Sequence, residues 1–233
     1  MPEIILASGS PRRRAFLDLL GLDHAVEPAG IDEPTPSVVE SPEAFARALA
    51  RAKASVVASR NPGKPVLAAD TVVSMDNQLL GKPSGPQDAV TMLQQLRGRT
   101  HDVTTGIAVV DREGRLRVGA ATTKVTMRPY GDDEIAASIQ AGTPFDKAGG
   151  YAIQDDSFLP VAHFDGCYCN VVGLPSRASD RSAGGNRRRS AGREPFRLLP
   201  YCLSCPLFRK RLSAIVLTGA GLPNPAIQGW EPR

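Results

Sequence analysis

Residues 66–75 read VLAADTVVSM, and this stretch decides how the chain folds. Apolar and β-branched side chains dominate it, which is typical of a buried β-strand. The turn-forming pair Asp76-Asn77 follows, so residues 78–80 are expected to return as the second strand of a hairpin. Asp70 interrupts the apolar run, and a carboxylate in a buried strand is costly to desolvate unless it is paired, hydrogen-bonded or bound to a cation.

These properties make Asp70 the best single candidate for a catalytic or metal-binding carboxylate. The alternative is a structural aspartate that caps a neighbouring turn. We favour that role less, because turn residues appear only after Met75.

Towards the N-terminus, the pattern predicts one strand and two helices. Residues 3–8 form a short apolar strand, and Ser10-Pro11 begins a helix that ends at Gly21. The expected inner face of that helix consists of Phe16, Leu17, Leu19 and Leu20. A second helix is expected to begin at Ser41-Pro42, and Lys53 lies at the border of its apolar stripe. The residues of that stripe are Phe45, Leu49, Ala52 and Val56.

Towards the C-terminus, strands and helices alternate without an internal repeat. The sequence predicts a helix after Pro86 and a long hairpin from residues 103–110 and 116–127. It also predicts a helix over residues 132–140, a glycine-rich loop over 143–154, and short strands that end at residues 170–172. The mixture indicates an α/β domain.

The composition changes after Pro175, and the change predicts a domain boundary. Residues 176–233 hold 11 basic and 3 acidic side chains, whereas residues 1–175 hold 17 basic and 21 acidic ones. Residues 176–193 offer almost nothing to bury. We therefore expect a globular domain over 1–175 and a poorly ordered basic tail over 176–233. Only this tail is a candidate for binding nucleic acid.

The expected localisation follows from two kinds of segment that we do not find in the sequence. We find no signal-peptide core and no membrane-length apolar run, so we expect a cytoplasmic protein without a membrane partner. Four cysteines do not make a disulfide scaffold. Two cysteine pairs and a histidine could together form a zinc site with ligands from two separated segments, but we favour buried thiols as the interpretation. The residues of that alternative are His163, Cys167, Cys169, Cys202 and Cys205.

A second group of candidates surrounds the start of the first helix. The segment Ser8-Gly9-Ser10-Pro11-Arg12-Arg13 joins a strand to a helix, where unsatisfied N–H groups and arginines favour an anion such as phosphate. A solvated basic turn is the alternative, and the segment does not match a Walker A loop. Glu33, Lys53, Lys82 and the pair Asp146-Lys147 complete a set suited to a polyphosphate with Mg²⁺ or Mn²⁺.

Five separated motifs together resemble the Maf nucleoside triphosphate pyrophosphatases. They are LASGSPRR at 6–13, ADTV at 69–72, LGKP at 80–83, DKAG with YAIQ at 146–154, and VVGLP at 171–175. The resemblance implies an elongated mixed sheet, like that of the inosine triphosphatases, with a central cleft between two lobes. It also implies hydrolysis of the α–β phosphoanhydride of dTTP or UTP to a nucleoside monophosphate and pyrophosphate, as house-cleaning of unwanted nucleotides.

The resemblance also assigns roles to individual residues. Asp70 would accept the proton of the attacking water and contact the divalent metal, with Glu33 as a second metal ligand. The remaining residues would bind substrate: Arg12, Thr71 and Gln154 would select the base, and Ser10, Arg13, Lys53, Lys82 and Lys147 would contact the phosphates.

Some alternatives remain open at this stage. A purine pyrophosphatase for ITP or XTP and a nucleotide-binding regulator of septum formation are the competing functions, and a homodimer is a further possibility. The family normally continues after Gly-Leu-Pro with an apolar helix, which residues 176–189 lack. A frame-shifted reading frame is the hypothesis that this difference suggests.

Overall fold

The computed structural model describes residues 4–34, 41–76 and 78–175, so the predicted tail lies outside the described residues. One seven-stranded sheet dominates the molecule, with the strand order β2-β1-β3-β5-β6-β7 and with β4 paired to β3. The strands are β1 (Ile4–Leu6), β2 (His24–Val26), β3 (Val66–Met75), β4 (Gln78–Leu80), β5 (Thr100–Val110), β6 (Leu116–Met127) and β7 (Val161–Asp165). The helices are α1 (Pro11–Leu19), α2 (Pro42–Arg60), α3 (Pro86–Leu96), α4 (Asp132–Gln140), the 3₁₀ turn η1 (Ala148–Gly150) and α5 (Tyr168–Val172).

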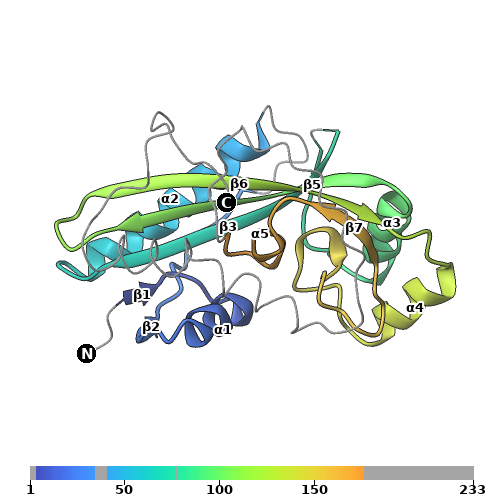
Figure 1. Cartoon of the computed structure of the whole chain (residues 1–233), viewed down its shortest axis with the longest axis horizontal. Helices are drawn as coiled ribbons and strands as arrows, with labels where there is room; N and C mark the ends of the chain where they lie inside the picture. The colour runs from blue at the N-terminus through green and yellow to red at the C-terminus, as the bar shows by residue number, and fades with distance from the viewer. Residues whose placement is uncertain (1–3, 35–40, 77, 176–233) are drawn as a thin grey trace, which may run out of the picture.

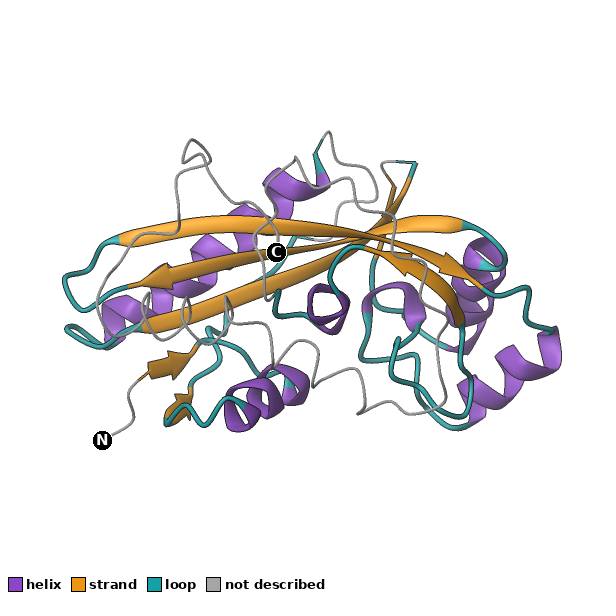
Figure 2. Ribbon diagram, in the orientation of Figure 1, coloured by secondary structure: helices purple, strands orange, loops and turns teal. Residues whose placement is uncertain are grey.

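The long antiparallel strands β3, β5 and β6 run the length of the molecule and give it an elongated shape (Figure 1). The short strands β1 and β2 add to this sheet in parallel beside one end of β3. Helix α2 covers one face of the sheet, and α1 and α5 lie against the other face (Figure 2). The predicted α/β class and mixed sheet are confirmed.

The face opposite α2 carries two apolar clusters, one at each end of β3. Leu67 and Ala69 pack with residues of α1 and α5, whereas Val73 and Met75 pack with residues of α3 and α4. Odd-numbered residues of β3 therefore point to this face, as strand alternation requires.

Most predicted elements form within one or two residues of their expected bounds, but three details are wrong. Residues 168–172 form helix α5 and not a strand, so Cys167 and Cys169 do not share a strand face. Leu19 was expected in the core of α1 and is 45% exposed. The buried stripe of α2 is also rotated by about one residue from the predicted one, so that Ala52 is exposed. The residues that α2 buries are Ala46, Leu49, Ala50, Ala54 and Val57.

Small residues allow α2 to lie very close to the sheet. Gly106 of β5 faces the backbone of α2, and a Cβ atom added at Gly106 would lie 2.2 Å from the carbonyl oxygen of Ala46. Gly106 is also the register partner of Asp70. The absence of a side chain at Gly106 therefore sets the distance between α2 and the strand that carries the candidate acid.

We predict that Gly106→Ala destabilises the protein by about 3 kcal/mol or more, because a methyl group there overlaps backbone atoms that cannot move without lifting α2. Urea unfolding followed by circular dichroism measures the loss. Gly85→Ala is the matched control, since a Cβ at Gly85 has nothing within 4 Å, and its cost should stay below about 1 kcal/mol. A Gly106→Ala protein as stable as the parent would show that the close approach of α2 is not required.

A second prediction concerns the pH dependence of stability. His101 at the start of β5 is 3% exposed, and its burial lowers its pKa from 6.5 to about 4. Below pH 6.5 the unfolded chain binds a proton at this histidine and the folded chain does not, so stability should fall as the pH drops from 6.5 to 4. We expect up to about 3 kcal/mol of loss from this group. Thermal unfolding of His101→Leu across this range should give a flatter profile, and parallel profiles would refute the prediction.

Candidate active site

The middle of β3 has one free edge, and the candidate residues gather there. One edge of β3 pairs with β5 over residues 66–74. On the other edge, the described residues supply partners only at 66–67, from β1, and at 73–75, from β4 (Figure 1). The loops after β1 and after β4 leave the sheet on either side of this interval. Side chains from both faces can therefore meet around residues 68–72.

On the α2 face of this interval, Asp70 is bound by a lysine. The carboxylate is only 7% exposed, and its Oδ1 lies 2.5 Å from Lys53 Nζ. The same ammonium lies 2.8 Å from Glu33 Oε1. Lys53 lies at the border of the buried face of α2, as the sequence predicts, and its side chain extends from there to Asp70 with only 12% of it exposed. The structure thus brings together three of the predicted site residues. The sequence predicts that Asp70 has a partner, and the structure identifies it as Lys53.

On the opposite face, Arg13 is held by three protein groups. Its Nε donates to the carbonyl oxygen of Gly173 at 2.8 Å, and its Nη1 and Nη2 donate to Ser8 Oγ and Thr71 Oγ1 at 3.0 Å. Thr71 Oγ1 also lies 2.8 Å from Thr105 Oγ1. Burial lowers the pKa of Arg13 to about 10, an effect that the nearby charge of Asp70 opposes.

Asp70 and Thr71 are consecutive, so the acid and the arginine approach the free edge from opposite faces of the sheet. Asp70 and Arg13, both predicted site residues, therefore have different protein partners. Asp70 contacts Lys53, and Arg13 contacts Thr71. Gly173 fits here because its φ is 116° and a Cβ atom would lie 3.3 Å from Thr71 Oγ1.

A second group of candidates lies between α1 and the glycine-rich loop. Arg12 Nη1 lies 3.2 Å from Asp146 Oδ2, and Lys147 Nζ contacts the other oxygen of Asp146 and donates to the carbonyl oxygen of Thr143 at 2.6 Å. Partial burial alone would raise the pKa of Asp146, but the hydrogen bond from Lys147 and the charges of Lys147 and Arg12 lower it. Sequence reasoning selected both cations and placed Asp146 in the same set, but it did not predict that Asp146 pairs with both of them.

The three remaining candidates, Lys82, Ser10 and Gln154, lie in the loops around these residues. Lys82 is exposed in the loop after β4, and the neighbouring Gly81 accepts a backbone hydrogen bond of 2.9 Å from Gly149, so the loops of Lys82 and Lys147 adjoin. Ser10 precedes α1 but its side chain does not cap the helix. Gln154 is half-buried at the end of the glycine-rich loop.

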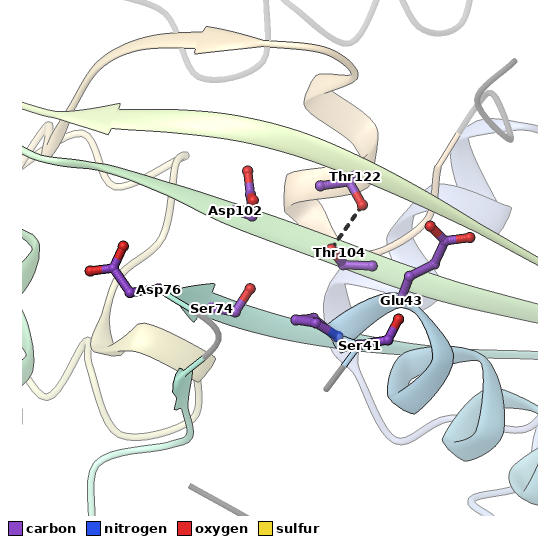
Figure 3. Close-up of a pocket in the computed structure, with 8 residues that line it drawn as sticks. Ser41, Glu43, Ser74, Asp76, Asp102, Thr104 and Thr122 are labelled. Carbon is purple, nitrogen blue, oxygen red and sulfur yellow. Dashed lines mark hydrogen bonds between the residues drawn. The ribbon is translucent and has the colours of Figure 1, made fainter. Parts of the chain in front are cut away.

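A polar cavity of about 540 Å³ opens on the α2 face, beside the first residues of α2 (Figure 3). Ser74, Thr104 and Thr122 form its floor, and three carboxylates lie among its lining residues. Each carboxylate already pairs with a cation, in the pairs Glu43–Arg47, Asp76–Arg99 and Asp102–Lys124. None of the predicted site residues lines this cavity, so it is not the candidate phosphate site.

Metal-binding capacity at the site rests on two carboxylates. Among the described residues, no group of three or more histidine, cysteine, aspartate or glutamate side chains converges. Glu33 and Asp70 share the Lys53 ammonium as a neighbour. Their oxygens are hard ligands of the type that Mg²⁺ and Mn²⁺ take, and Mg²⁺ is commonly held by one or two carboxylates with water and substrate phosphates.

A strand edge with a buried acid, a lysine beside it and further cations around it fits a ligand that carries phosphate groups. Residues 3–181 match the family model described as Maf-like protein, and the chain belongs to the Maf family. It is 52% identical over 205 residues to the dTTP/UTP pyrophosphatase of Thermomicrobium roseum, covering 88% of this chain and 93% of that protein. That length exceeds 175 residues, so the similarity extends beyond Pro175.

Two further comparisons place the chain among known proteins. The dTTP/UTP pyrophosphatase of Nitratidesulfovibrio vulgaris is 45% identical over 172 residues, which cover 74% of this chain and 82% of that protein. The structure of a HAM1 protein from Coxiella burnetii aligns with a TM-score of 0.41 at 21% identity, over 56% of this chain and 75% of that chain. We draw no argument from the second likeness. No described helix is long and apolar enough to cross a membrane.

The Lys53–Asp70 pair generates a prediction about stability. Lys53→Met leaves Asp70 buried beside Glu33 without a cation, and breaking a buried pair in this way costs about 3–5 kcal/mol. Adding Asp70→Asn to Lys53→Met should restore part of the loss, because it removes the uncompensated charge. Urea unfolding at pH 8 measures both variants. Arg51→Met, which removes an exposed cation from the same helix, is the control and should change stability little. A double variant no more stable than Lys53→Met would contradict this account.

Proposed function

We propose that this chain hydrolyses dTTP and UTP between the α and β phosphates and releases the nucleoside monophosphate and pyrophosphate. The observation that carries the proposal is the buried Asp70, held by Lys53 at the free edge of β3 and flanked by cationic loops. The names of the relatives from T. roseum and N. vulgaris support the substrate and the bond.

Asp70 is the group proposed to accept a proton from the attacking water. Lys53 binds Oδ1 and fixes the rotation of the carboxylate, which leaves Oδ2 to orient the water. The oxygen of water attacks the α phosphorus and its proton passes to Asp70. The bond between the α phosphorus and the oxygen that bridges it to the β phosphorus breaks. Pyrophosphate leaves with the bonding electron pair.

The cations are proposed to bind the three phosphates. Lys82 and Lys147 lie on adjoining loops on one side of the free edge, and the first turn of α1 lies on the other. Ser10 and the N–H groups at the start of α1 add hydrogen-bond donors, which suit phosphate oxygens. Arg13 contributes charge to this region while its three hydrogen bonds keep the turn in place. Such fixed donors stabilise charge that develops on the leaving pyrophosphate.

A divalent ion fits the pair of carboxylates at this edge. We propose that Glu33 and Asp70 hold Mg²⁺ or Mn²⁺ together with the substrate. When bound, the ion neutralises charge on phosphate oxygens. Arg12, Thr71 and Gln154 are proposed to select the base, and the two hydrogen bonds of Thr71 to Arg13 and Thr105 fix its hydroxyl for that purpose.

The test is Asp70→Asn, assayed with dTTP and UTP in the presence of Mg²⁺ or Mn²⁺, with products identified by ³¹P NMR. Loss of the proton acceptor should reduce kcat by about 10²–10⁴-fold. The matched control is Asp102→Asn, another carboxylate on the same sheet face that pairs with a lysine outside the site and should leave kcat unchanged. Orthophosphate in place of pyrophosphate would refute the proposed bond. Faster hydrolysis of ITP or XTP would assign the chain to the purine-directed alternative.

A further inference from the structure

The loop over residues 147–154 carries two of the proposed substrate-binding residues, Lys147 at its start and Gln154 at its end. Between them lie Gly149 and Gly150, both with φ above 70°. A turn of this kind has little conformational preference of its own, because glycine populates positive and negative φ about equally. The position of the loop must therefore come from what it packs against.

Tyr151 fixes this loop to the sheet. Its side chain is buried, and a Cβ atom at Gly149 would lie 3.4 Å from the Tyr151 ring and 3.1 Å from Val73. The glycine turn is thus packed between the tyrosine ring and β3. Tyr151 is three residues before Gln154, and Ile153 between them packs against the same apolar cluster as Tyr151, so this part of the loop is anchored through the core.

His101 holds the end of the Tyr151 side chain. The Nε2 atom of His101 lies 2.6 Å from Tyr151 Oη, and the two rings meet edge to face with centroids 5.4 Å apart. Both residues are buried, so water does not compete for this hydrogen bond.

The other ring nitrogen of His101 helps to explain why a histidine occupies this position. Nδ1 is buried and has no hydrogen-bond partner among the described residues. A buried imidazole with one unpaired nitrogen stabilises a core less than an aliphatic side chain of similar size would. The contact with Tyr151 is therefore what distinguishes histidine from leucine at this position.

We infer that His101 is a positioning residue for base selection, which acts by holding Tyr151 and so fixing Gln154 relative to Thr71. This inference rests on the proposed function for the identity of the substrates. It assigns to the His101–Tyr151 pair the choice between a pyrimidine and a purine nucleotide, and it leaves the chemistry at Asp70 unchanged.

The experiment compares His101→Leu, Tyr151→Phe and the double variant with the parent protein. Equilibrium binding of dTTP and ITP is measured by calorimetry, and kcat and KM are measured for the same nucleotides. We expect each single variant to weaken dTTP binding and raise its KM about tenfold, while ITP binding and kcat change less than threefold. The double variant should resemble either single variant, because both remove the same contact.

Two further variants separate positioning from general stability. His101→Gln places an amide where Nε2 lies and should recover part of the preference for dTTP. Tyr130→Phe is the matched control, since Tyr130 is buried in the same apolar cluster and donates its hydroxyl to the carbonyl oxygen of Leu93 at 2.7 Å, away from the loop. Tyr130→Phe should lose stability comparable to that lost by Tyr151→Phe and keep the preference for dTTP.

The outcomes separate this inference from the proposed function. An unchanged dTTP-to-ITP binding ratio in His101→Leu and Tyr151→Phe overturns the inference, and so does an equal change in Tyr130→Phe. A parent protein that binds dTTP selectively without hydrolysing it refutes the proposed function, while the binding ratios still decide the role of His101. A parent protein that binds neither nucleotide overturns both.

Discussion

The contact between Lys53 and Asp70 is the interaction on which the site depends. A carboxylate at the centre of an apolar strand requires a cation at short range, and that cation must come from an element packed on the same face. Helix α2 supplies it, and α2 lies close enough because Gly106 has no side chain and because the helix presents small alanines to the sheet. The tight packing of α2 and the position of the acidic group are therefore one structural requirement, met by residues far apart in the sequence.

On the other face of β3, hydrogen bonds through threonine hydroxyls hold a charged side chain, that of Arg13. A chain of hydrogen bonds runs from Arg13 through Thr71 and Thr105 to the carbonyl oxygen of Asn170. It joins the first turn of α1 to α5, and so connects Arg13, the last residue of the first motif, through Thr71 to α5. Strand alternation places Asp70 and Thr71 on opposite faces, and the free edge of β3 allows both to serve one ligand. Among the described strands none pairs with this edge over residues 68–72, and that feature of the sheet makes this possible.

The sequence predicted the elements better than their orientation. Strand alternation and turn residues located β3 and the long hairpin, and the desolvation argument predicted correctly that Asp70 has a partner. The rotation of α2 was missed because Phe45 and Val56 are more apolar than the alanines, whereas Gly106 favours small residues at the contact. Helix α5 was missed because five residues show no period, and its Val-Val pair favours a strand in isolation. There, hydrogen bonds from Asn170 Nδ2 to Val103 and Thr123, and Gly173 at the helix end, override local preference.

The charge arrangement explains how a domain with more acidic than basic residues presents a cationic site. Lys53 pairs with Asp70 and Glu33, and Arg12 and Lys147 pair with Asp146. In the proposed function, Lys53 keeps its contact with Asp70, and binding of a triphosphate is an exchange at Arg12 and Lys147, where phosphate oxygens replace the carboxylate oxygens of Asp146. The exchange gains less free energy than the pairing of isolated charges would, because each cation gives up one partner for another. A site of this kind favours the ligand with the higher charge, so that a triphosphate displaces the carboxylates more effectively than the monophosphate that remains after hydrolysis.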